Sequence, residues 1–122
     1  MKKKILTIDD SQSIRQMISM TLSSSGFVVD EACDGLEGYE KATACAYDAI
    51  LTDLNMPNMN GLDFIKKFRS HPSSQGVPII FLTTESDETS KREAKSSGAI
   101  GWIVKPFEQS QLLAVVKKVA GT

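Results

Sequence analysis

The stretch Ala49-Ile50-Leu51-Thr52-Asp53-Leu54-Asn55-Met56-Pro57 is a short apolar run that stops at a carboxylate and continues into a proline-containing loop. An apolar run of this length, bounded by a turn signal, predicts a buried strand. Asp53 is then the residue at which the strand leaves the core. We therefore expect the chemistry of this chain to centre on Asp53.

Three other short apolar runs also stop at polar side chains: residues 4–8 before Asp9 and Asp10, residues 77–82 before Thr83 and Thr84, and residues 101–104 before Lys105 and Pro106. In a parallel sheet these ends lie along one edge, and open sheets of this kind bind ligands in the crevice outside the carboxyl ends of their strands. We expect the carboxylates, hydroxyl and amine to converge there.

Helical patterns alternate with the strand patterns: residues 11–25 with Ser11 as N-cap, residues 35–46, a short segment containing Leu62, Ile65 and Phe68, residues 86–97, and a helix that starts at Glu108. Residues 27–32 form a more polar strand that we expect at the sheet edge. Alternation at this spacing implies an α/β fold, a five-stranded parallel sheet with helices on both faces. Residues 86–97 carry almost nothing apolar beyond Ala94, so we expect that helix to be weakly anchored.

Size and composition limit the remaining possibilities. The 122 residues fit one domain, so we expect a single domain over residues 1–122, without an effector domain. The formal net charge of -1 gives no general support for binding to nucleic acid or to an anionic membrane. No apolar stretch suits an export signal or a membrane span, so we expect a cytoplasmic protein, and a monomer. Cys33 and Cys45 lack metal-type spacing, and we expect them to be small, mostly buried hydrophobic residues.

Three carboxylates in one pocket, those of Asp9, Asp10 and Asp53, repel one another. At about 4 Å and an effective dielectric constant near 20, each pair is worth about 4 kcal/mol. A divalent cation that prefers oxygen ligands, such as Mg²⁺, offsets this repulsion, and so does the ammonium group of Lys105. An Asp carboxylate beside a cation is also a nucleophile toward phosphorus, and Lys105 and Thr83 are suited to bind a phosphoryl group. Aspartates that only cap turns are the competing interpretation.

The order Asp9-Asp10, Asp53 with Met56-Pro57 and Gly61, Thr83, and Lys105-Pro106-Phe107 resembles the receiver domain of two-component response regulators, over the whole chain. Within that family the chain is most similar to stand-alone chemotaxis response regulators, through residues 82–86 and 98–107. The resemblance implies a flavodoxin-like doubly wound fold with strand order 2-1-3-4-5. It also implies a phosphorylation-activated protein of signal transduction.

The resemblance implies a phosphoacceptor and a metal site. Asp53 would receive a phosphoryl group from a chemotaxis histidine kinase, giving an aspartyl phosphate. The Mg²⁺ cofactor would be held by Asp9, Asp10, Asp53 and the backbone carbonyl of Asn55, with Asp9 acting through water. Apart from this magnesium-dependent self-phosphorylation and autodephosphorylation, we expect no enzyme activity.

The other implied roles concern activation and turnover. Lys105 would contact the phosphoryl group, and its bond to Pro106 would be cis. Thr83 would move toward the phosphoryl group on activation, and Asn55 and Glu85 match positions that tune dephosphorylation.

Three residues depart from the family pattern. Trp102 stands where a smaller switch aromatic, Tyr or Phe, is usual, and its bulk opposes an inward–outward rotation. Thr84 replaces the common Ala or Gly, which narrows access to the phosphoryl pocket. Asn60 replaces the more usual Asp, with little expected effect.

Phosphorylation is expected to reshape the face made by the helix over residues 86–97, the Trp102 strand and the last helix, for a partner to read. The expected partner is a flagellar motor switch protein, and a phosphatase is a further candidate. A phosphate sink that drains a shared kinase is the closest alternative. Two further alternatives are disfavoured by the sequence. An aspartyl-nucleophile phosphatase of the haloacid dehalogenase type needs a second Asp at the position of Asn55. A flavodoxin-like cofactor binder needs a phosphate-binding loop at the position of Asp9 and Asp10.

Overall fold

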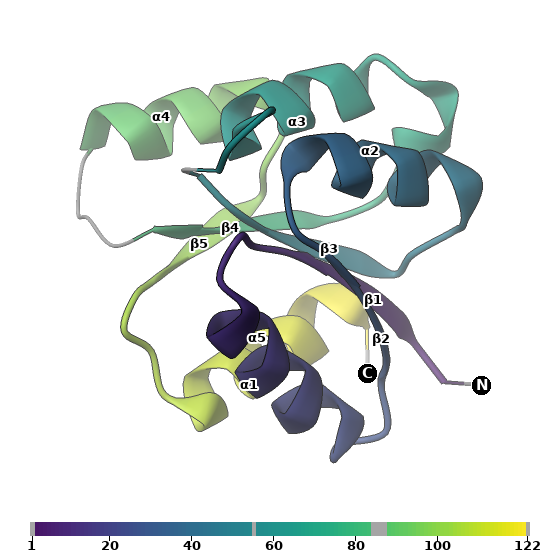
Figure 1. Ribbon diagram of the computed structural model, residues 1–122, viewed down its shortest axis with the longest axis vertical. Helices are drawn as coiled ribbons and strands as arrows, with labels where there is room; N and C mark the ends of the chain where they lie inside the picture. The colour runs from purple at the N-terminus through teal and green to yellow at the C-terminus, as the bar shows by residue number, and fades with distance from the viewer. Residues whose placement is uncertain (1, 55, 84–87, 122) are drawn as a thin grey trace.

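The computed structural model describes residues 2–54, 56–83 and 88–121. In these ranges five strands alternate with five α-helices (Figure 1). The strands are β1 (Lys4–Ile8), β2 (Val28–Ala32), β3 (Ala49–Asp53), β4 (Ile79–Thr83) and β5 (Gly101–Val104). The helices are α1 (Gln12–Ser23), α2 (Gly35–Ala44), α3 (Gly61–Arg69), α4 (Glu88–Ser97) and α5 (Gln109–Ala120), and one 3₁₀ turn, η1 (Pro72–Ser74), precedes β4.

The strands form one parallel sheet in the order β2-β1-β3-β4-β5, which confirms the predicted α/β fold and strand order. The predicted edge strand, β2, lies at one edge, and β3 lies in the middle. Because Asp53 ends this central strand, its neighbours on either side are the ends of β1 and β4. The topology therefore places Asp53 at the switch point where open sheets bind ligands.

Helices cover both faces of the sheet: α2, α3 and α4 lie on one side, and α1 and α5 on the other (Figure 1). Successive strand residues contribute to opposite layers of the core. In β3, Ile50 packs in the layer under α2, α3 and α4, whereas Ala49 and Leu51 pack in the layer over α1 and α5. Burial on both faces explains why this strand is a continuous apolar run rather than an alternating one.

Helix ends differ from the predicted bounds by a few residues. The first helix was expected to reach Ser25, but it ends at Ser23 with Ser24 as its C-cap, and the chain turns at Gly26, where φ is 93°. The second helix ends at Ala44 rather than at residue 46, because the backbone of Cys45 is already extended, with φ -134° and ψ 154°. Beyond it, Tyr47 is buried and donates its hydroxyl proton to Asp30 Oδ2 at 2.7 Å.

The two cysteines form no disulfide, as expected, but the prediction that they are mostly buried is wrong. Cys33 and Cys45 are both free and exposed. Cys33 lies in the β2–α2 connection and Cys45 caps the end of α2, and residues at such connections face solvent more readily than residues inside a strand. Among the helices in the described ranges, none combines the length and apolar content that crossing a membrane requires.

Candidate functional site

Strand ends bring acidic and basic side chains together at one edge of the sheet. Asp9 follows β1, Asp53 ends β3, and Lys105 follows β5. One carboxylate oxygen from each of Asp9, Asp10 and Asp53 lies within 4.8 Å of the other two. The ammonium of Lys105 contacts both Asp9 and Asp53. The structure therefore brings together the charged groups that the strand pattern predicted to converge.

Asp9 is fully buried, and each of its polar atoms has a partner. Its N–H donates to the carbonyl of Ala32 at 3.0 Å, and its own carbonyl accepts from Arg15 Nη1 at 2.6 Å. Its Oδ1 accepts from the backbone N–H of Ser11 at 2.9 Å, and its Oδ2 accepts from Lys105 Nζ at 2.8 Å. This carboxylate is therefore held in one orientation by protein groups.

Asp53 is mostly buried, with 13% of its side chain exposed. Its Oδ1 accepts a hydrogen bond from the backbone N–H of Leu54 at 2.9 Å and lies 3.4 Å from Lys105 Nζ. Burial raises the pKa of the Asp53 carboxyl, and the charge of Asp9 raises it further, whereas Lys105 acts in the opposite direction. The carboxylate that faces the site is thus held in an environment that disfavours its charge.

Asp10 and Thr83 complete the described part of the site. Asp10 is exposed, so it gives the cluster an open side. Thr83 is buried at the end of β4, and its carbonyl accepts from the N–H of Lys105 at 2.6 Å. The Lys105–Pro106 bond is cis, as expected. Asn55, Thr84 and Glu85, to which the resemblance gives ligand, access and tuning roles, lie outside the described residues.

Trp102 is held against two neighbours on the outer side of β5. Its side chain is 40% exposed, its ring centroid lies 6.1 Å from that of Phe81, and Lys91 Nζ lies 4.7 Å from the centroid of its ring. An ammonium over an indole face is an attractive cation–π contact. Trp102 therefore faces outward in this structure.

Sequence reasoning missed Arg15, which supports Asp9 from α1. Besides its bond to the carbonyl of Asp9, its Nε lies 3.1 Å from Glu31 Oε1 on β2. One feature of the sequence could have identified Arg15: it is a basic residue near the start of a predicted helix. The helix dipole disfavours a cation there, so an acceptor or anion close by is expected to hold it.

The donor set suits a hard divalent cation. The cluster offers carboxylate oxygens from three residues, one of them on the open side. Mg²⁺ is bound through one or two carboxylates and keeps several waters. Both oxygens of Asp9 already accept protein hydrogen bonds, so the oxygens of Asp10 and Asp53 are the more available ones.

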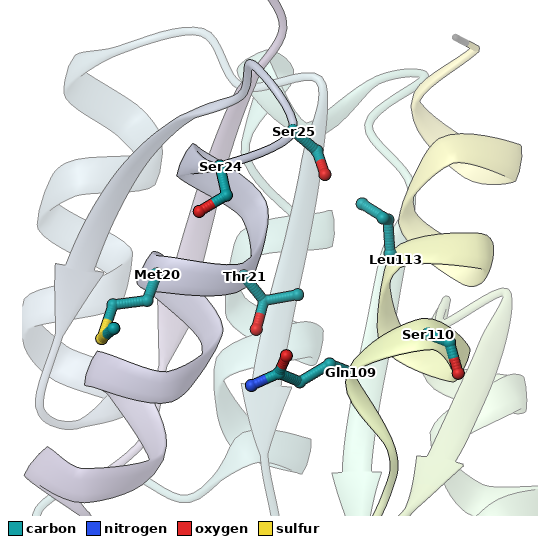
Figure 2. A pocket seen from close by; sticks show the side chains of 7 residues that line it. All are labelled: Met20, Thr21, Ser24, Ser25, Gln109, Ser110 and Leu113. Atoms are coloured by element: carbon teal, nitrogen blue, oxygen red, sulfur yellow. The ribbon is translucent and has the colours of Figure 1, made fainter.

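A separate hollow of about 390 Å³ lies between the end of α1 and the beginning of α5. Figure 2 shows the side chains around it, with Thr21 and Gln109 facing each other across the gap. Its lining is Met20, Thr21, Ser24, Ser25, Gln109, Ser110 and Leu113. None of these side chains ionises at neutral pH, so this hollow lacks the charged groups of the strand-end site.

Comparison with known proteins gives one family. Residues 5–117 match the model of the response regulator receiver domain. Chemotaxis protein CheY1 of Helicobacter pylori is 43% identical over 121 residues, which are 98% of this chain and 98% of that protein. The transcriptional regulatory protein SrrA of Staphylococcus aureus is 39% identical over 117 residues, 96% of this chain but 47% of that protein.

Solved structures agree with this assignment. The chemotaxis response regulator CheY4 of Vibrio cholerae has a TM-score of 0.93 and 44% identity, covering 98% of this chain and 99% of that one. The receiver domain of the sensor histidine kinase PA1611 of Pseudomonas aeruginosa, solved with a magnesium ion coordinated in its active site cleft, has a TM-score of 0.91 and 26% identity, with full coverage of both chains. This chain therefore belongs to the response regulator receiver domain family.

Proposed function

We propose that this chain is a phosphorylation-activated signalling protein that accepts a phosphoryl group from a histidine kinase on Asp53. The observation that carries the proposal is the placement of one mostly buried carboxylate at the end of the central strand, with two more carboxylates within 4.8 Å and an ammonium group 3.4 Å away. A turn-capping Asp needs neither the other two carboxylates nor the lysine.

In the proposed transfer, an oxygen of Asp53 attacks the phosphorus of a phosphohistidine. The phosphorus–nitrogen bond breaks, its electron pair stays on the imidazole nitrogen, and a phosphorus–oxygen bond forms. Asp53 Oδ1 already faces Leu54 N–H and Lys105, which leaves Oδ2 as the oxygen for the new bond. Lys105, 3.4 Å from Oδ1, is placed to neutralise charge on the transferring group.

We propose that Asp10 and Asp53 hold Mg²⁺ directly and that Asp9 acts through water, because both Asp9 oxygens already accept protein hydrogen bonds. The backbone carbonyl of Asn55 remains the expected third direct ligand from the protein. When bound, the cation supplies positive charge for the phosphoryl oxygens. The magnesium ion in the similar PA1611 receiver domain supports this assignment.

The test is intact mass after incubation with a small-molecule phosphodonor, with Mg²⁺ or with chelator. Wild type should gain one phosphoryl group only with Mg²⁺, and Asp53→Asn should gain none. Asp63→Asn is the matched control, because Asp63 is an exposed carboxylate on α3 that is not a member of the acidic cluster, and it should label as wild type does. Labelling of Asp53→Asn, or labelling of wild type in chelator, would reject the proposal.

The proposed output is a change in affinity at the face of α4, β5 and α5, in the control of a flagellar motor. Lys91, Arg92 and Lys95 line a hollow on this face together with Trp102. Basic side chains beside a partly exposed aromatic favour an acidic partner segment with an apolar anchor. The similarity to CheY1 and CheY4 supports a chemotaxis role and a motor switch protein as this partner.

A phosphate sink that drains a shared kinase uses the same chemistry at Asp53 but needs no partner. The two functions are separated by measuring the affinity for a motor switch protein with and without beryllium fluoride as phosphoryl mimic. An effector should bind more tightly with the mimic, and Asp53→Asn should show no gain. A sink should show equal affinity in both states.

A further inference from the structure

The turn between β2 and α2 is joined to the loop that follows Asp53. Asp34 is the N-cap of α2 and is 8% exposed. Its Oδ1 accepts from the backbone N–H of Glu37 at 2.8 Å, as an N-cap does. Its Oδ2 accepts from the side-chain amide of Asn58 at 2.7 Å. One carboxylate therefore starts a helix and holds a loop 24 residues further along the chain.

The backbone is in close contact at the same place. The N–H of Gly35 donates to the carbonyl of Met59 at 3.0 Å. A Cβ at position 35 would lie 2.4 Å from that carbonyl oxygen, so the approach requires glycine. Asn58 has a φ of 66°, a left-handed conformation that residues other than glycine adopt only where their surroundings hold them in it.

The other end of the loop returns to Asp53. The N–H of Gly61 donates to the carbonyl of Leu54 at 2.9 Å, and a Cβ at position 61 would lie 2.1 Å from the carbonyl oxygen of Asp53. The loop therefore has its two ends, Leu54 and Gly61, held together beside the backbone of Asp53. Its tip, Asn58, is held by Asp34.

We propose that Asp34 and Asn58 are a positioning pair for the site at Asp53: their hydrogen bond selects the loop conformation in which the site binds Mg²⁺. The inference rests on the proposed function, in which this loop carries the ligand carbonyl of Asn55. Neither member of the pair is itself among the proposed ligands. Changing the bond should therefore alter the affinity for Mg²⁺ while all of the ligand residues remain in place.

The test is the Kd for Mg²⁺ of the full chain, from an NMR titration with MgCl₂ that follows the amides of Asp10 and Leu54. Asn58→Asp places two carboxylates opposite each other and should weaken Mg²⁺ binding about tenfold, the lower end of the range for groups that support metal ligands. Asp34→Asn should change the Kd little, because the amide of Asn58 can turn over and accept from the new amide while the oxygen at position 34 keeps the N–H of Glu37. In the double variant Asp34→Asn/Asn58→Asp the amide at position 34 donates to the carboxylate at position 58, and the Kd should return close to that of wild type.

Long-range charge predicts a different pattern. Asp34→Asn removes a negative charge and Asn58→Asp adds one, so a purely electrostatic effect would weaken binding in the first variant and strengthen it in the second. Asn60→Asp is the matched control, because it adds the same charge two residues away at the N-cap of α3, where Asp is also a good cap. It should not weaken Mg²⁺ binding.

Folding is checked by urea unfolding of every variant. If a single variant does not fold, Asn58→Gly replaces it, because glycine adopts the positive φ without strain and removes only the side-chain donor. A folded Asn58→Asp variant that binds Mg²⁺ as wild type does, or a folded double variant that does not recover, would overturn the positioning role. If wild type itself neither binds Mg²⁺ nor becomes phosphorylated, the proposed function fails instead.

Discussion

Lys105 lies closer to Asp9 than to Asp53: its Nζ is 2.8 Å from Asp9 Oδ2 and 3.4 Å from Asp53 Oδ1. The side chains of Lys105 and Asp9 are only 12% and 1% exposed. Removing one partner of such a pair leaves the other charge buried, which costs about 3 kcal/mol or more. We predict that Lys105→Met lowers the free energy of unfolding by about 3 kcal/mol at neutral pH in chelator, measured by urea unfolding.

The reason for that loss can be checked separately. Asp9→Asn/Lys105→Met removes both charges and should be more stable than Lys105→Met alone. Adding Mg²⁺ should return part of the stability of Lys105→Met, because the cation then opposes the charge of Asp9. Lys66→Met, at an exposed position on α3, is the matched control and should change little. Equal stability of Lys105→Met and Lys66→Met would contradict the prediction.

Asp53→Asn should stabilise the protein at neutral pH in the absence of metal. Burial and the charge of Asp9 raise the pKa of Asp53 in the folded state. A carboxyl with a raised folded pKa adds stability below its unfolded pKa and loses it as pH rises through the folded pKa. The ionised group therefore costs stability at pH 7, and the asparagine amide avoids that cost.

Urea unfolding in chelator, at about pH 7 and about pH 4, near the ordinary pKa of Asp, measures the effect. The stability gain of Asp53→Asn should be larger at the higher pH and should shrink on acidification, as wild-type Asp53 becomes protonated. A gain that grew on acidification would mean that Lys105 outweighs burial and Asp9 at this position.

The sheet and the charged strand ends were predictable because their signals are local. An apolar run that stops at Asp53 reports both burial and the point where the strand leaves the core. Once the strands are parallel, Asp9, Asp10 and Lys105 must reach the same edge. Family resemblance added the strand order and the proposed roles, which no single run contains.

The supporting residues were not predictable in the same way. Asn58 and Asp34 are 24 positions apart, and each alone reads as an ordinary turn or cap residue. Arg15 reads as a surface charge until the carbonyl of Asp9 is placed beside it. The positions of Cys33 and Cys45 were predicted wrongly because residue type gives only an average burial, whereas the ends of helices and strands decide the actual exposure.

Thr7→Val should stabilise the protein by about 1 kcal/mol, because it removes a buried polar group that has no partner. Thr7 is fully buried in β1, and among the described residues its Oγ1 has no hydrogen-bond partner. Valine has nearly the same shape. Thr52→Val is the matched control: Thr52 is equally buried, but its Oγ1 donates to the carbonyl of Asp53 at 3.0 Å, so this change should destabilise. Urea unfolding that gave both changes the same sign would contradict the prediction.

Arg69 connects three parts of the chain at the edge opposite the site. Its guanidinium donates to the carbonyls of Ser74 at 2.7 Å, Val77 at 2.7 Å and Gly98 at 2.8 Å. A Cβ at position 98 would lie 2.7 Å from Arg69 Nε, so the guanidinium occupies the space that only glycine leaves open. This side chain therefore fixes the end of α4, the helix that the proposed partner contacts.

Arg69→Lys should destabilise the protein by about 3 kcal/mol, because hydrogen bonds to charged groups are worth about 1.5–3 kcal/mol each and one ammonium cannot reach three carbonyls in this fork arrangement. Burial lowers the pKa of Arg69, but the group stays charged at neutral pH, so the loss should not depend on pH between 6 and 8. Hydrogen exchange should show where stability is lost. The N–H of Ile100, which donates to the carbonyl of Ile79 at 2.9 Å, should exchange faster in Arg69→Lys than in wild type. Arg92→Lys, at an exposed position on α4, should leave both stability and exchange unchanged. If Arg69→Lys had the same stability and the same exchange rate at Ile100 as Arg92→Lys, the carbonyl contacts of Arg69 would contribute nothing to holding α4.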